Sequence, residues 1–281
     1  MPRSTSMLLQ PLLLSIVLSL VGCDATHPSP RTDVQRAAYF RQTTLYQFNA
    51  VLARAAQAAN RHDWIGEQTL RVKINRKNEL LSCTAEADPK LPPGRFPDNA
   101  KLAALVEKVC WDIILPSAGA ETFASATAEE VELVQLLIFS SPSQIPESDR
   151  LRHRQARVEM EQSDFVWQQT FAQESLDSIG VATFRGWADP QGRVLDCLAE
   201  LDLSFLQPEA FKPDPDLQRR LTERCKKMDM GRVAGFTIPR NYPTEFYITV
   251  EYTPWKGGSK KAVSPPREPL SRRALRQRHQ G

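Results

Sequence analysis

One stretch of the chain occurs twice, and this duplication constrains the fold more than any other feature. GEQTLRVKINRKNELLSC at residues 66–83 is matched 114 residues later by GVATFRGWADPQGRVLDC at residues 180–197. Five positions are identical in the two stretches, namely Gly66 with Gly180, Thr69 with Thr183, Arg71 with Arg185, Leu81 with Leu195 and Cys83 with Cys197. The chain is therefore expected to contain two copies of one structural unit.

The residue pattern gives each unit the order helix-β-β-α-β. Apolar residues alternate with polar ones before and after a turn, which is typical of two paired strands, and Leu195, Cys197, Ala199 and Leu201 are predicted on a buried face. Asn78 and Gly192 occupy the same place in the turn, and both residue types tolerate a positive φ. Each unit then has an amphipathic helix that ends near a cysteine and a closing strand, near 131–139 or 245–253. Long helical stretches at about 33–61 and 148–178 form the leading helices of the two units.

The N-terminus resembles a bacterial lipoprotein signal. An apolar run at residues 8–21 has the length of a secretory core and is too short for a confident membrane span. It ends in Leu20-Val21-Gly22-Cys23, which resembles a lipobox. The resemblance implies cleavage before Cys23 and lipidation of this cysteine, and therefore a lipid-anchored periplasmic protein. Asp24 resembles an inner-membrane retention signal, with the outer membrane as the alternative. An ordinary signal peptide with an incidental cysteine is the other interpretation.

The four remaining cysteines are expected to form one disulfide in each unit. An exported chain meets an oxidising compartment, and four cysteines allow three pairings. The repeat selects Cys83 with Cys110 and Cys197 with Cys225, because the separations of 27 and 28 residues then match. Each disulfide would join a strand to a helix and contribute roughly 3–4 kcal/mol to stability. Buried free thiols are the alternative.

The order β-β-α-β resembles the C-terminal domain of the TonB family. The turn at residues 189–194 and the helix at 214–228 carry the likeness, which covers about 180–253 and, more loosely, 66–140. The resemblance implies an α+β fold of two tandem units that bind periplasmic partners, partly by strand addition at a sheet edge. The lipobox and the short tether replace the membrane helix and Pro-rich spacer of TonB, so energy transduction is not expected.

The expected organisation has five segments. They are a signal peptide at 1–22, a lipidated cysteine and short tether at 23–32, a first unit at 33–140, a second unit at 141–253 and a disordered basic tail at 254–281. The tail holds eight Lys or Arg residues and one acid, whereas residues 1–253 have a formal net charge of −4. The tail either contacts anionic lipid headgroups, contacts an acidic protein or only aids solubility. Export argues against nucleic acid as a partner.

Catalysis, a cofactor and a metal ion are not expected. The four histidines, which are His27, His62, His153 and His279, lie outside metal-binding and hydrolase motifs. No phosphate-binding GxxxxGK[ST] motif occurs, and the cysteines are assigned to lipid and disulfides. An enzyme with an unrecognised site is therefore the least favoured class.

Protein binding is the expected role, and the two units would offer a wide or bivalent surface. Residues 116–130 and 230–245 are predicted to be exposed, equivalent loops in which specificity lies. Aromatic residues in and after the second loop are the candidate partner-binding residues, namely Phe236, Tyr242, Phe246 and Tyr247. The alternative places Phe236 and Phe246 in the second core. The specific expectation is an immunity protein that neutralises a periplasmic toxin, and the alternative is an accessory protein of a transport or secretion system.

Overall fold

A computed structural model describes residues 33–87, 96–123, 129–239 and 241–256. The first half contains α1 (Asp33–Ala59), β1 (Gly66–Asn75), β2 (Leu80–Glu86), α2 (Asn99–Asp112), the 3-10 helix η1 (Ala120–Phe123) and β3 (Glu130–Phe139). After the short η2 (Pro142–Gln144), the second half contains α3 (Glu147–Thr170), β4 (Gly180–Ala188), β5 (Val194–Asp202), η3 (Pro208–Ala210), α4 (Pro215–Cys225), η4 (Met230–Arg232) and β6 (Thr244–Tyr252). Among these helices, none is long and apolar enough to cross a membrane.

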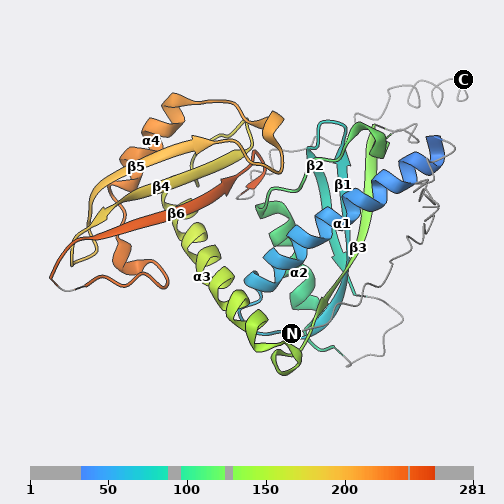
Figure 1. Cartoon of the computed structure of the whole chain (residues 1–281), viewed down its shortest axis with the longest axis horizontal. Helices are drawn as coiled ribbons and strands as arrows, with labels where there is room; N and C mark the ends of the chain where they lie inside the picture. The colour runs from blue at the N-terminus through green and yellow to red at the C-terminus, as the bar shows by residue number, and fades with distance from the viewer. Residues whose placement is uncertain (1–32, 88–95, 124–128, 240, 257–281) are drawn as a thin grey trace, which may run out of the picture.

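Each half forms a three-stranded antiparallel sheet with its first strand in the centre. The strand order is β2-β1-β3 in the first sheet and β5-β4-β6 in the second. Helices pack on one face of each sheet (Figure 1), and none of the helices that the structure describes covers the opposite face. The predicted α+β class is confirmed, with two small antiparallel sheets and a disulfide in each half. The leading helices are shorter than predicted, because α3 ends at Thr170 and an irregular segment leads from there to β4.

The duplicated turn between the first two strands has the same hydrogen bonds in both units. Oδ1 of Asn75 accepts from the backbone N–H groups two and four residues later, at 2.9 and 3.0 Å. Oδ1 of Asp189 accepts from the equivalent two groups, both at 2.9 Å. Asn78 and Gly192 have φ values of 60° and 88°, so the predicted positive φ is confirmed at both positions.

The two disulfides are those that the repeat selects. Cys83 on β2 joins Cys110 on α2, and Cys197 on β5 joins Cys225 on α4. All four cysteines are buried in the two hydrophobic cores, one between each sheet and its helices. Each crosslink therefore fixes a helix to the strand at one edge of its sheet.

A β-bulge corrects the predicted buried face of β5. Trp187 pairs with Asp196 and Ala188 pairs with Val194, so Leu195 has no partner on β4. Leu195 is consequently 58 % exposed, although the alternating pattern predicted it to be buried. Leu81 is the bulged residue at the equivalent place in the first sheet. The bulge is thus part of the repeated unit, and it shifts the alternation by one residue.

The predicted exposed loops are partly buried. Phe123 on η1 is 1 % exposed and fills the first core, while Thr122 accepts or donates a hydrogen bond with Thr44 of α1 at 3.1 Å. In the second loop, Met230 and Val233 belong to the second core. Residues 124–128 and 240 lie outside the described residues. Short 3-10 turns explain the difference, because they direct apolar side chains inward from segments that the polar composition suggested were wholly solvated.

The two units pack against one another through loops and helix ends. Gln207 of the second unit donates from Nε2 to the carbonyl oxygen of Leu115 at 2.8 Å, in a buried position. The backbone N–H of Ser117 donates to Leu206 at 2.8 Å. At the other end of the junction, Arg157 on α3 donates to the carbonyl oxygen of Asn60 at 2.9 Å. Hydrogen bonds at both ends of the junction thus fix the orientation of the two sheets.

Candidate functional site

The four aromatic residues predicted to bind a partner divide into two pairs. Phe246 is 2 % exposed in the second core, and the half-buried Phe236 meets it edge to face with 6.4 Å between the ring centroids. The alternative assignment of these two residues to the core therefore holds. Tyr242 and Tyr247 have exposed side chains. Of the two pairs, only this second one is fully exposed.

Tyr247 lies on the face of the second sheet that is free of helices, which we call the outer face. It pairs across the sheet with Arg185 on β4, and Arg185 also pairs with Leu198 on β5. Trp187, in the next outward position of β4, lies between Asp196 and Glu245. Trp187 is 49 % exposed and Tyr247 is 69 % exposed. The outer face therefore presents an aromatic and aliphatic centre around one arginine, with carboxylates at its rim.

Trp187 is a surface residue that the sequence analysis misses, although the sequence contains a signal for it. The even-numbered residues Ala182, Phe184 and Ala188 are buried on β4, whereas the odd-numbered Trp187 points to the other face of the strand. A tryptophan at an outward position of a strand exposes a large aromatic side chain to water. Tryptophan, tyrosine and arginine are the residue types most often found where binding energy concentrates in protein interfaces.

The corresponding face of the first sheet has a different chemistry. Lys73 occupies the position of Trp187 and pairs with Glu130 at 3.7 Å. Arg71 pairs with Glu86 at 3.1 Å and Glu132 at 3.6 Å. Its exposed apolar residues follow one strand, β3, and are Val134, Leu136 and Ile138. The two cations of the first outer face are therefore paired with carboxylates of the same face, and an aliphatic strip runs along one edge.

The last strand of each unit has an edge on which no other described strand pairs, which we call its free edge. Gln57 of α1 donates to the carbonyl oxygen of Ile138 at 3.0 Å from outside the sheet. Every second residue of a strand points its backbone groups to the same side, so those of Leu136 and Val134 also point away from β1. In the second unit, Nζ of Lys256 donates to the carbonyl oxygen of Glu251 at 2.9 Å in the same way. No hydrogen bond from another described residue reaches the outward backbone groups of Val134, Leu136, Tyr247 and Thr249. Both sheets can therefore accept a further strand.

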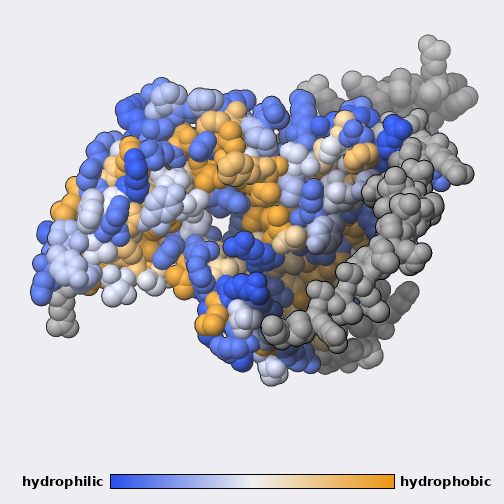
Figure 2. All heavy atoms as spheres, viewed as in Figure 1, coloured by the Kyte–Doolittle hydropathy of each residue, from blue (hydrophilic) through white to orange (hydrophobic). Residues whose placement is uncertain are grey.

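A cleft of about 1850 Å³ separates the two units. Figure 2 shows apolar residues gathered around this hollow. One wall is a face of α2 that includes Trp111, and the other is a face of α3 that includes Phe165. Trp255, which follows β6, also lines the cleft. This volume exceeds the roughly 300–1,000 Å³ of small-molecule sites. The cleft is thus large enough for a polypeptide segment.

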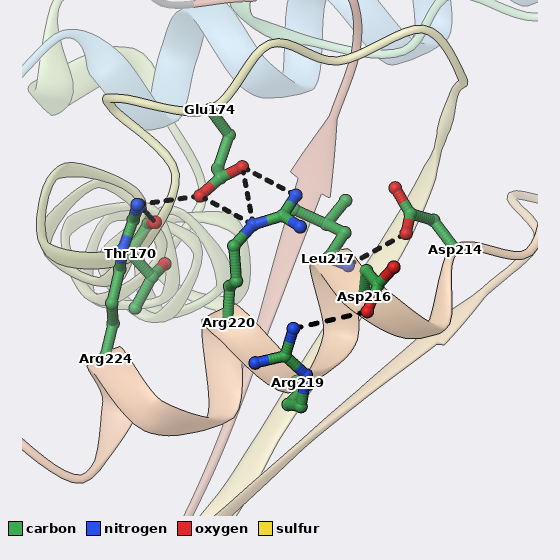
Figure 3. A network of polar contacts seen from close by, with 8 residues as sticks. All are labelled: Thr170, Glu174, Asp214, Asp216, Leu217, Arg219, Arg220 and Arg224. Carbon is green, nitrogen blue, oxygen red and sulfur yellow. Dashed lines mark hydrogen bonds and ion pairs between the residues drawn. The ribbon is translucent and has the colours of Figure 1, made fainter.

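Charged residues on the second-unit side of the cleft form a fixed network. Glu174, with a side chain that is 8 % exposed, pairs with Arg220 at 2.9 Å and with Arg224 at 2.7 Å, and Arg224 also donates to the carbonyl oxygen of Thr170. Figure 3 shows both guanidinium groups reaching from α4 toward the segment after α3. The hydrogen bond to Glu174 raises the pKa of Arg220 above its ordinary value. The network holds α4 against the end of α3, which is a structural role.

Lys256 is a buried cation at the junction. Burial lowers the pKa of its ammonium group, while Asp112, Glu251 and Asp164 act in the opposite direction. The ammonium nitrogen lies 4.8 Å from the centroid of the Trp167 ring. This lysine joins the end of β6 to α3, and residue 257 follows it directly in the chain.

The two histidines that the structure describes lie among other neighbours. His62 stacks on Trp64 with 4.9 Å between centroids, and His153 lines a small pocket beside Arg150. Within the described ranges, no group of three His, Cys, Asp or Glu residues is placed to hold a metal ion. Cys23, His27, His279 and the basic tail from residue 257 onward lie outside the described residues.

Comparisons with protein-family models, with curated proteins and with solved structures find no match to this chain. The likeness to the TonB C-terminal domain therefore stays a prediction that rests on the residues quoted above.

Proposed function

We propose that the chain is a non-catalytic, lipid-anchored periplasmic protein-binding protein. The most specific version of this proposal is an immunity protein that neutralises a toxin effector in the periplasm. The observation that carries the binding role is the outer face of the second sheet, where Trp187 and Tyr247 are exposed around Arg185. Large apolar side chains that gather on a surface favour contact with another protein over contact with water.

The architecture supports an inhibitor that binds as a rigid body. Each unit has its own core and disulfide, and buried hydrogen bonds such as that from Gln207 to Leu115 hold the units together. A preorganised surface loses little conformational entropy on binding, which favours tight association. A lipid on Cys23 would keep such an inhibitor at the membrane, in the compartment that the toxin enters.

Affinity capture from periplasmic extract tests this proposal. The oxidised chain would be used as bait beside a sample treated with dithiothreitol. The proposal predicts one stoichiometric partner whose hydrolase or pore-forming activity is silenced in the complex, and loss of that partner after reduction. A stoichiometric partner that keeps its activity in the complex would contradict inhibition.

A second candidate function is favoured by the free edge of β3. The backbone groups of Val134 and Leu136 are open to a further strand, and their side chains form an exposed aliphatic strip. An accessory envelope protein of a transport or secretion system could bind its partners there by strand addition. Capture of transport or secretion components would favour this candidate, and substitution of Leu136 by proline would then abolish the capture because proline cannot donate a backbone hydrogen bond.

A further inference from the structure

We infer that the C-terminal basic tail of this chain docks on the outer face of its own second sheet. The inference rests on the proposed function, because it assigns an internal occupant to the same surface that would bind the partner. The tail would cover Trp187 and Tyr247 in the free protein, and a partner would displace it.

Charge is the first argument for this occupant. Asp196, Asp202 and Glu245 project from the outer face, and none has a basic partner among the residues that the structure describes. Arg185 is the single cation of this face and is paired with Glu200 at 3.1 Å. Residues 257–281 contain seven Lys or Arg residues and one acid, a formal net charge of +6. The tail thus supplies the charges that the outer face lacks.

The contrast with the first sheet makes the assignment specific. Lys73 there is flanked by Ser82 and Glu132, whereas the equivalent Trp187 is flanked by Asp196 and Glu245. A built-in cation has thus been replaced by an aromatic ring between two carboxylates. Guanidinium groups stack on tryptophan and pair with carboxylates, so this row suits an arginine from elsewhere.

The sequence of the tail fits both the centre and the rim of the outer face. Leu270 and Leu275 can cover apolar side chains, and four arginines lie among and after them, namely Arg272, Arg273, Arg276 and Arg278. Aliphatic residues would meet Leu198 and the aromatic rings, while the arginines would meet the rim. A segment with cations alone would offer no partner for the exposed apolar centre.

The place where the described chain stops brings the tail to this face. Lys256 bonds the carbonyl oxygen of Glu251 at the free edge of β6, and the tail begins at the next residue. A coil of 25 residues has a root-mean-square span of about 25–30 Å, and a nine-residue strand is about 30 Å long. The tail can therefore reach every row of the outer face, at the millimolar effective concentrations typical of short tethers.

Carbodiimide crosslinking of the purified full chain tests the inference without any partner. The reagent joins a lysine to a carboxylate that it contacts, and the variant Arg273→Lys with Arg276→Lys extends the set of amines while it keeps the charge. We expect links within one chain from Lys260, Lys261 or the two introduced amines to Asp196, Glu200, Asp202 or Glu245. These links should be lost at about 1 M salt, where the Debye length is about 3 Å.

Carboxylates of the first outer face are the matched control. Links that fall equally on Glu67, Glu86, Glu130 and Glu132 would overturn the inference, because they would show unspecific attraction. Links only between different chains would assign the outer face to a second copy and would also overturn it. Absence of links combined with successful partner capture would leave the proposed function intact and refute the tail as the occupant.

Discussion

The backbone N–H of Ala85 on β2 donates to Oε1 of Glu107 on α2, with 2.8 Å between nitrogen and oxygen. The second unit repeats this contact with other residues, because Ala199 on β5 donates to Oγ1 of Thr222 on α4 at 3.0 Å. In both units a helix side chain satisfies an N–H group on the outer edge of the sheet. The helix therefore protects the edge that it covers, and the free edge lies on the opposite side, at β3 or β6.

Replacing Thr222 by valine should destabilise the chain by about 1 kcal/mol, because the N–H group of Ala199 loses its partner while the volume is kept. Urea unfolding followed by circular dichroism would measure the change. Glu223→Ala is the control, since the exposed side chain of Glu223 forms an ion pair with Lys226 alone among the described residues, and the change should stay within about 0.5 kcal/mol. Equal stability of the valine variant and the parent would contradict this role for Thr222.

Removing either disulfide should cost about the same free energy. The two crosslinks close loops with sequence separations of 27 and 28 residues, so replacing both cysteines by serine should cost about 3–4 kcal/mol in each case. Denaturant titrations of the Cys83→Ser/Cys110→Ser and Cys197→Ser/Cys225→Ser variants provide the comparison. A large loss in one variant with none in the other would show that the units do not depend on their disulfides equally.

Truncation of two adjacent residues on β6 should change the free energy of unfolding by very different amounts. Phe246→Ala should lower the free energy of unfolding by about 3–5 kcal/mol, because the ring is buried in the second core. Tyr247→Ala should change it by no more than about 0.5 kcal/mol, because the side chain is exposed. Thermal or urea unfolding distinguishes the two. Similar losses would contradict the assignment of Tyr247 to the outer face.

Lys256 should make stability rise in the alkaline range. Burial lowers the pKa of its ammonium group, so the unfolded chain binds the proton more tightly than the folded chain does. The unfolding free energy should therefore increase as the pH rises through the folded pKa toward the ordinary value of 10.5.

Lys256→Met removes this titration, and the difference between the two proteins should shift in favour of the parent as the pH rises. Burial raises the pKa of Tyr252, which acts in the opposite sense in both proteins and cancels in the comparison. Denaturant unfolding at a series of pH values would measure the difference. Parallel curves for parent and variant would rule out Lys256 as the titrating group.

The sequence permits the prediction of two features that it repeats, the disulfides and the turn. The matched spacing of Cys83–Cys110 and Cys197–Cys225 identifies both crosslinks, and the equivalent places of Asn78 and Gly192 identify the turn. Leu195 is mispredicted because a bulge changes the parity of a strand without any mark in the apolar pattern. Local patterns fail where backbone irregularity decides which way a side chain points.

The surface residues were predictable only in part. The sequence identifies Tyr247 as an aromatic candidate, but its separation from the buried Phe246 depends on the strand register. The alternation of buried and exposed residues along β4 is enough to predict that Trp187 points outward. That Asp196 and Glu245 lie beside it depends on the pairing between strands, which the sequence does not reveal. The cleft could not be predicted, because it depends on how two separately folded units pack.

Partner capture with paired surface variants tests the central claim most directly. The variant Trp187→Ser/Tyr247→Ser alters the outer face of the second sheet, and Leu136→Ser/Ile138→Ser is the matched change on the first. Equal unfolding midpoints of both variants would first establish that each is folded. The account predicts that the parent and the first-sheet variant retain the same stoichiometric partner. The affinity of the second-sheet variant for this partner should fall at least tenfold, which corresponds to about 1.4 kcal/mol of binding free energy. Undiminished capture by the second-sheet variant would contradict the account.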